Sequence, residues 1–101
     1  MQTINSFDLA KLLLSDNPPV LIDVREEWER AEFHIGGLHI PVSEIFERID
    51  EIPVDIPVVL YCRKGIRSMM VIQRLTNNNN YNLINLTGGI DAWQKEMATG
   101  S

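Results

Sequence analysis

Hydrophobic residues in this chain gather in short continuous runs that alternate with segments of helical spacing. Three runs, at residues 20–24, 57–61 and 83–86, consist mainly of branched apolar side chains. Such runs are typical of strands that are buried on both faces of a parallel sheet. Two shorter runs, at residues 3–4 and 38–40, predict a brief first strand and a third strand. The pattern therefore predicts about five strands.

The segments between these runs place their apolar residues with the spacing of helices. We expect helices at about residues 7–14, 26–33, 44–49 and 66–75, and a last one after Gly89. The helix at residues 66–75 is nearly apolar all round and is therefore expected to be central. The alternation predicts an α/β domain with a mostly parallel sheet and helices on both faces. In such sheets the functional site lies beyond the carboxyl ends of the strands.

Several residues are expected to fix the ends and the faces of these helices. Ser6 and Ser43 are good N-cap residues for the helices that follow them. Trp28 and Phe33 are expected to face inward from the second helix. Asparagine tolerates the left-handed backbone that closes a helix, so the run at residues 77–80 predicts a C-cap and a turn.

Length and composition restrict the function classes that remain. The 101 residues suit one domain spanning residues 1–101, and the net charge of −5 argues against nucleic acid as a partner. No apolar run is long enough to span a membrane and no signal peptide is visible, so a cytoplasmic location is expected. The single cysteine excludes an internal disulfide and a multi-cysteine metal site. We expect neither a metal nor another cofactor.

The charges are distributed unevenly along the chain. All 14 acidic residues lie outside residues 56–90, whereas that window contains Arg63, Lys64, Arg67 and Arg74. A positive field within an acidic protein indicates a small anionic substrate. The alternative is that these cations cluster by chance on a solvated face.

The clearest strand runs directly into Cys62, which is followed by a basic loop and a helix. Loop amides and a helix N-terminus together favour negative charge, and Gly65 permits the tight turn that this geometry needs. We therefore expect Cys62 to react as a thiolate. Arg67 is expected to clamp an oxyanion substrate through two donors. The alternative is an inert buried thiol, which is common for a lone cysteine.

At this loop the sequence resembles the rhodanese family. The resemblance extends over about residues 20–93 and consists of motifs in the family's order: Asp23-Val24-Arg25-Glu26 with Trp28-Glu29, His34-Ile35, His39-Ile40-Pro41, the loop Cys62-Arg63-Lys64-Gly65-Ile66-Arg67-Ser68, and Leu86-Thr87-Gly88-Gly89-Ile90 with Trp93. It implies a single rhodanese-like domain whose site consists of Cys62 as nucleophile and the loop residues Arg63, Lys64, Gly65, Ile66, Arg67 and Ser68 as substrate and persulfide binders.

The resemblance also implies a reaction in two steps. The Cys62 thiolate attacks the outer sulfur of a donor such as thiosulfate, sulfite leaves, and Cys62 carries a persulfide. The persulfide sulfur then passes to cyanide or to a thiol acceptor. Because the chain has no second cysteine, an outside acceptor must discharge the persulfide.

Loop length separates sulfur transfer from a related chemistry. Four residues lie between Cys62 and Arg67. Phosphatases and arsenate reductases of similar fold carry five and commonly have histidine before the cysteine, where this chain has Tyr61. Both features favour sulfur transfer.

Residues outside the loop receive more modest roles. Asp23 and Arg25 are expected to support the site, and for Arg25 a structural ion pair with Asp23 or a nearby glutamate is the favoured interpretation. His34 and His39 lack the spacing of a helical zinc site and are interpreted as structural.

Three other functions stay open beside the small-molecule enzyme. The chain is also consistent with a persulfide carrier that receives sulfur from one protein and passes it to another. A phosphatase or arsenate reductase of related fold is less favoured, and so is a non-catalytic interaction module.

Overall fold

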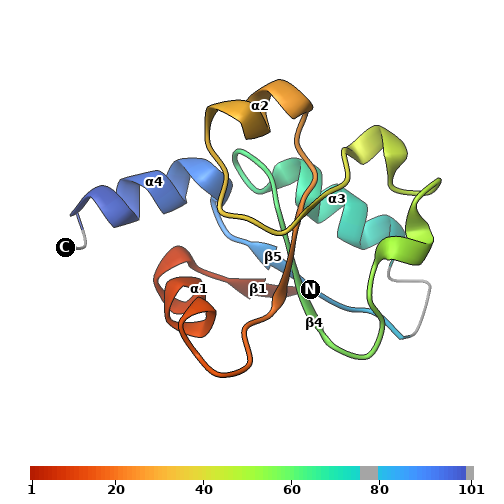
Figure 1. The fold of residues 1–101 in the computed structure, drawn as a ribbon, viewed down its shortest axis with the longest axis horizontal. Helices are drawn as coiled ribbons and strands as arrows, with labels where there is room; N and C mark the ends of the chain where they lie inside the picture. The colour runs from red at the N-terminus through yellow and green to blue at the C-terminus, as the bar shows by residue number, and fades with distance from the viewer. Residues whose placement is uncertain (76–79, 100–101) are drawn as a thin grey trace.

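A five-stranded parallel sheet forms the centre of the computed structural model, which describes residues 1–75 and 80–99. The strand order is β1-β5-β4-β2-β3, and each neighbouring pair runs in parallel (Figure 1). The strands are β1 (Gln2–Ile4), β2 (Val20–Asp23), β3 (Leu38–His39), β4 (Pro57–Tyr61) and β5 (Asn82–Leu86). The expected α/β fold is confirmed, and the first strand in sequence lies at an edge beside the last.

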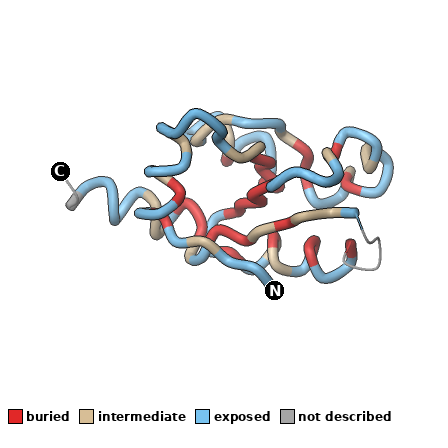
Figure 2. Tube along the Cα trace, turned by 90° about the horizontal axis from the view of Figure 1, so that it is seen from below, coloured by how far each residue is buried: buried red, intermediate tan, exposed pale blue. Residues whose placement is uncertain are grey.

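Helices cover both faces of this sheet, which confirms the second expectation of the fold class. The helices are α1 (Ser6–Leu13), α2 (Glu27–Glu32), α3 (Ile66–Leu75) and α4 (Gly89–Thr99), with two 3-10 turns, η1 (Val42–Glu44) and η2 (Ile49–Glu51). Side chains of α3 and of the 42–52 segment form one core with β2 and β4. Leu9 of α1 and Ile90 of α4 pack in a second core on the other face. The buried segments therefore run through the middle of the molecule (Figure 2).

The predicted helix at residues 44–49 is wrong. Residues 45–48 form turns between the 3-10 turns η1 and η2, and the buried side chains of the 42–52 segment are those of Ile45 and Ile52. The hydrogen bonds of so short a segment do not by themselves stabilise a helix, so packing decides whether one forms. Tertiary packing of Ile45 and Ile52 therefore decides the backbone path, and Ser43 caps no α-helix.

The predicted N-cap at Ser6 is also wrong, by one residue. Asn5 caps α1, and its side-chain oxygen accepts a hydrogen bond from the amide of Asp8 at 2.8 Å. Asparagine and serine are comparable N-caps, so the sequence alone did not separate them. Ser6 is the first residue of α1 and is buried.

Trp28 and Phe33 do not face inward as expected. Trp28 is 60% exposed and Phe33 is 37% exposed, whereas Glu29 is the buried residue of α2. The helix has only six residues, and its inward position holds a carboxylate with a specific partner that is described below. The predicted pattern assumed an apolar face, which α2 does not have.

The helix α3 has the predicted bounds but is amphipathic rather than apolar all round. Val71, Ile72 and Leu75 are buried, whereas Ile66 and Met70 are exposed. The predicted C-cap at residues 77–80 falls on a segment that lies largely outside the described residues. Within the described residues, no helix has the length and apolar character needed to cross a membrane.

Candidate active site

The strand β4 carries Cys62 to the carboxyl edge of the sheet. Residues 58–61 are buried, and Cys62, the next residue, is 1% exposed. The chain then turns at Gly65, whose φ of 89° lies in the left-handed region that favours glycine, and α3 begins at Ile66. The strand, loop and helix expected from the sequence are therefore present, and the thiol lies beneath its own loop.

The sulfur of Cys62 is surrounded by hydrogen-bond donors. The amide of Gly65 donates to Sγ at 3.1 Å and the amide of Ser68 at 3.4 Å. The hydroxyl oxygen of Ser68 lies 3.3 Å from the same sulfur. The first amides of α3 have no partner within the helix, and the helix dipole is positive at this end. The two amides and the helix dipole stabilise negative charge on a sulfur atom.

A second polar residue continues this network and was not predicted. Ser68 donates its hydroxyl hydrogen to Oδ1 of Asn85 over 2.5 Å, and Nδ2 of Asn85 donates to the carbonyl of Gly65 at 3.0 Å. Ser68 and Asn85 are both buried. Asn85 lies on β5 between apolar neighbours, and the sequence signal for it was a polar residue inside a strand that otherwise appears buried.

The N-terminus of α4 donates hydrogen bonds to the backbone of the loop. The amide of Ile90 donates to the carbonyl of Cys62 at 2.9 Å, and that of Asp91 donates to the carbonyl of Arg63 at 3.0 Å. A side chain on Gly89 would place Cβ only 2.3 Å from the carbonyl oxygen of Cys62. Glycine is required at residue 89 because the backbone of α4 approaches the loop so closely.

Arg67 forms an ion pair with Glu29 of α2. Its two terminal nitrogens donate to the two carboxylate oxygens of Glu29, both at 2.8 Å. These hydrogen bonds lower the pKa of Glu29 to about 2, although burial acts in the opposite direction. The pKa of Arg67 is raised, first by the same hydrogen bonds. The expected clamping of a substrate by Arg67 stays a prediction, and it requires Arg67 to part from Glu29.

Asp23 and Arg25 form a buried ion pair below α2. Nε of Arg25 donates to Asp23 Oδ1 at 2.9 Å, and a terminal nitrogen of Arg25 also donates to the carbonyl of Phe33 at 2.6 Å. Burial lowers the pKa of Arg25, but the hydrogen bonds and charge of Asp23 leave it raised. Arg30 adds a further contact to Asp23 at 3.3 Å. The pair holds the backbone at both ends of α2, which is a supporting role.

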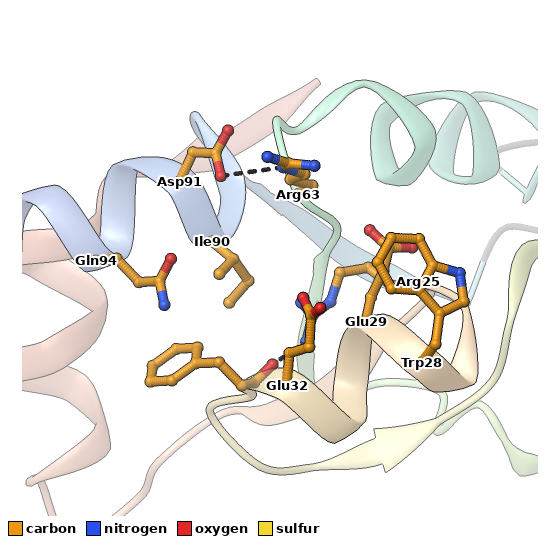
Figure 3. A pocket seen from close by; sticks show the side chains of 9 residues that line it. Arg25, Trp28, Glu29, Glu32, Arg63, Ile90, Asp91 and Gln94 are labelled. Atoms are coloured by element: carbon orange, nitrogen blue, oxygen red, sulfur yellow. Dashed lines mark hydrogen bonds and ion pairs between the residues drawn. The ribbon is translucent and has the colours of Figure 1, made fainter.

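Arg63, an exposed cation of the loop, lines a cavity of about 210 Å³. Arg63 is exposed and lies 3.3 Å from Asp91, while Lys64 next to it is exposed. Figure 3 shows Arg63 and Asp91 on one side of the cavity, with Trp28 and Glu32 on the side of α2. Trp28 and Phe33 line this cavity and are not core residues. The structure thus brings Arg63 to a cavity beside α2, and Lys64 is exposed in the same loop.

The histidines take part in local backbone contacts. Nδ1 of His34 accepts a hydrogen bond from the amide of Gly36 at 2.9 Å. The Nε2 atom of His39 lies 2.7 Å from the carbonyl oxygen of Arg25. Tyr61, which precedes the cysteine, donates its hydroxyl to the carbonyl of Gly36 at 2.9 Å, and burial raises its pKa to about 12. These contacts anchor the segment that joins α2 to β3.

The chain resembles proteins of known family over most of its length. Residues 6–96 match the family described as Rhodanese-like domain. A sulfurtransferase of Allochromatium vinosum is 37% identical over 91% of this chain and 87% of that protein. The putative sulfurtransferase YtwF of Bacillus subtilis is 34% identical over 95% of this chain and 93% of that protein. The crystal structure of a rhodanese-like domain protein from Staphylococcus aureus superimposes with a TM-score of 0.86 at 29% identity, covering 92% of this chain and 91% of that one.

Proposed function

This chain belongs to the rhodanese-like domain family, and we propose that it is a sulfurtransferase in which Cys62 carries sulfur as a persulfide. In the first step the Cys62 thiolate attacks the outer sulfur of thiosulfate, and the sulfur–sulfur bond of the donor breaks. The electron pair of that bond leaves with sulfite. One hard transfer is thereby divided into two easier ones.

In the second step an acceptor nucleophile attacks the outer sulfur of the persulfide. Cyanide is converted to thiocyanate, and a thiol is converted to a persulfide. In both cases the Cys62 thiolate is the leaving group. Cys62 is the only cysteine of the chain, so the persulfide has no internal thiol to meet. The acceptor is therefore external.

The proposal rests chiefly on the position of the sulfur among donors at the start of α3. The amides of Gly65 and Ser68 donate to Sγ at 3.1 and 3.4 Å, which favours the thiolate that the first step needs, and the Ser68 hydroxyl oxygen lies 3.3 Å from the same sulfur. Gly65 supplies one of these amides, and its conformation lets the following residue, Ile66, begin the helix. Ser68 supplies both an amide and the hydroxyl.

The cations of the loop have different parts in the proposed reaction. Arg63 lines the cavity, Lys64 is exposed next to it in the loop, and both attract an anionic donor by charge. Arg67 is held by Glu29 in the absence of substrate. We propose that a sulfonate group competes with Glu29 for Arg67, because a guanidinium binds either group through two donors.

A second candidate function is a carrier of persulfide sulfur between proteins. The observation that favours it is the apolar surface around the loop, where Trp28, Ile66 and Met70 are all exposed. Large apolar side chains of this kind are enriched at the centres of protein interfaces. In that case a protein donor or acceptor takes the place of the small molecules, and the chemistry at Cys62 is unchanged.

The first test is sulfur transfer from thiosulfate to cyanide by the wild type and by Cys62→Ala. We expect thiocyanate from the wild type and none from the variant, together with a mass increase of one sulfur atom on Cys62 after incubation with thiosulfate alone. Hydrolysis of an aryl phosphate, measured in parallel, is expected to be absent. A folded wild type that yields neither thiocyanate nor the mass increase contradicts thiosulfate as donor.

The carrier function is tested with a purified cysteine desulfurase and its substrate cysteine. A protein carrier is expected to gain one sulfur atom on Cys62 in this mixture and none when the desulfurase is omitted. Lys11→Ala, on the remote helix α1, serves as a matched surface variant beside Ile66→Ala at the loop. If Ile66→Ala is loaded with sulfur as fast as Lys11→Ala, the result argues against docking of the desulfurase at the apolar surface.

A further inference from the structure

The hydroxyl group of Ser68 lies between two hydrogen-bond acceptors. Its oxygen is 2.5 Å from Oδ1 of Asn85 on one side and 3.3 Å from Sγ of Cys62 on the other. A hydroxyl has a single hydrogen to donate. The Ser68 hydroxyl can therefore donate a full hydrogen bond to Asn85 or to a Cys62 thiolate, but not to both at once.

The orientation of the Asn85 side chain is fixed by its other hydrogen bond. Nδ2 donates to the carbonyl of Gly65 at 3.0 Å, so the amide nitrogen must face that carbonyl. A flipped amide would set two oxygen atoms against each other there. Oδ1 consequently faces Ser68 and can only accept.

We propose that Asn85 is a positioning residue that controls which way the Ser68 hydroxyl points, and thereby how readily Cys62 ionises. With a neutral thiol, Ser68 donates to Asn85 and the Cys62 S–H donates to the Ser68 oxygen. When Cys62 loses its proton, the hydroxyl turns to the sulfur anion and Oδ1 of Asn85 is left without its donor. A buried acceptor that loses its partner raises the free energy of that state.

The competition between Asn85 and Cys62 for the Ser68 hydroxyl also has a consequence for the persulfide. This part of the inference rests on the proposed function. In the persulfide the negative charge lies on the outer sulfur and Sγ is neutral. The Ser68 hydroxyl then returns to Asn85, which restores the hydrogen bond that ionisation had broken. Asn85 therefore disfavours the resting thiolate relative to the loaded state.

Asn85 touches the loop as well as Ser68, and the test must separate the two routes. Removing Asn85 also frees the carbonyl of Gly65, whose amide donates to Sγ. A route through Ser68 disappears when Ser68 is absent, whereas a route through Gly65 persists. A double-mutant cycle distinguishes them.

The experiment measures the rate of alkylation of Cys62 by iodoacetamide as a function of pH. The proteins are the wild type, Asn85→Ala, Ser68→Ala and the double variant, with Asn82→Ala on the same strand as a control. We expect Asn85→Ala to lower the pH of half-maximal rate by about one unit when Ser68 is present. The shift should vanish in the Ser68→Ala background, and Asn82→Ala should show none.

Equal shifts in both backgrounds would overturn the proposal, because Asn85 would then act through the loop backbone. The absence of a shift from Asn85→Ala would overturn it too. Asn85→Leu, which keeps much of the buried volume, is measured in parallel as a second variant in case Asn85→Ala folds poorly. Alkylation does not involve sulfur transfer, so a failed cycle in an active sulfurtransferase counts against this inference alone.

Discussion

Arg67 of α3 and Glu29 of α2 are joined by two hydrogen bonds of 2.8 Å across 38 residues of sequence. The pair ties α3, which begins at the loop after Cys62, to the short helix α2, which borders the cavity. Glu29 is the only buried residue of α2 among those the structure describes. The ion pair is therefore the main inward contact of that helix.

The ion pair between Glu29 and Arg67 predicts that the free energy of unfolding decreases at acidic pH. The pKa of Glu29 is lowered from 4.5 to about 2. The ion pair therefore contributes fully to the free energy of unfolding at a pH above the unfolded-state pKa, and this contribution is lost as the pH falls from about 4.5 to about 2. We expect Glu29→Gln to reduce the free energy of unfolding at neutral pH by about 1 kcal/mol, because Arg67 is partly exposed and screened. Urea denaturation of both proteins, at neutral pH and below the pH range in which Glu29 titrates, measures this difference in the free energy of unfolding. A deficit of the variant that stays constant through that range would contradict the ion pair as its cause.

Gly89 is predicted to be essential to the loop for a reason of space. Gly89→Ala forces Cβ against the carbonyls of Cys62 and Arg63, which lie 2.3 and 2.5 Å from it. Gly36→Ala is the matched control, because its φ is also positive but no atom lies within 4 Å of the added Cβ. We expect Gly36→Ala to cost about 1–2 kcal/mol with sulfur transfer retained. Gly89→Ala should be less stable and lose transfer, and equal behaviour of the two would disprove the steric argument.

Lys64 is predicted to help an anionic donor to bind without contributing to stability. Lys64→Gln removes one exposed positive charge from the loop, next to Arg63. We expect the KM for thiosulfate to rise about threefold at low ionic strength and the difference to fade in high salt. Steady-state kinetics at two salt concentrations measure this, with Lys11→Gln on α1 as the control. A KM that is insensitive to both the substitution and salt would remove Lys64 from the proposed site.

Asp23 is predicted to be important for folding rather than for chemistry. Asp23→Asn leaves the buried Arg25 without its carboxylate, and Arg30 also loses a partner. Breaking a buried ion pair from one side costs about 3–5 kcal/mol. Urea denaturation is expected to show a loss of this order. A stable variant with abolished sulfur transfer would instead give Asp23 a direct part in the reaction.

The sequence predicted that Cys62 lies between a buried strand and a loop that leads into a helix, because that position depends on local signals. The run at residues 57–61 is strongly branched and apolar, and Gly65 with the basic residues on both sides of it marks a turn before a helix. Each of these signals lies within a few residues of Cys62. The strand, the loop and the bounds of α3 follow from them without long-range information.

The failures lie where tertiary contacts override local pattern. The 42–52 segment follows the packing of Ile45 and Ile52 into the core and not its helical spacing. Trp28 is exposed because the inward position of α2 is occupied by Glu29, whose partner Arg67 is distant in sequence. Asn85 belongs to the site only because β5 lies beside β4, a pairing that the spacing of residues within β5 does not reveal.

The adjacency of β1 and β5 at the sheet edge also bears on how the protein matures as it is made. Thr3 of β1 is paired in register with Asn85 of β5, so β1 has no partner strand in the sheet until β5 has been synthesised. Chains emerge from the ribosome starting at the N-terminus, and pairings between distant segments form slowly. Cys62 is therefore synthesised well before Asn85 and the α4 amides that complete its surroundings. A nascent chain consequently passes through a period in which its thiol is present but not yet enclosed.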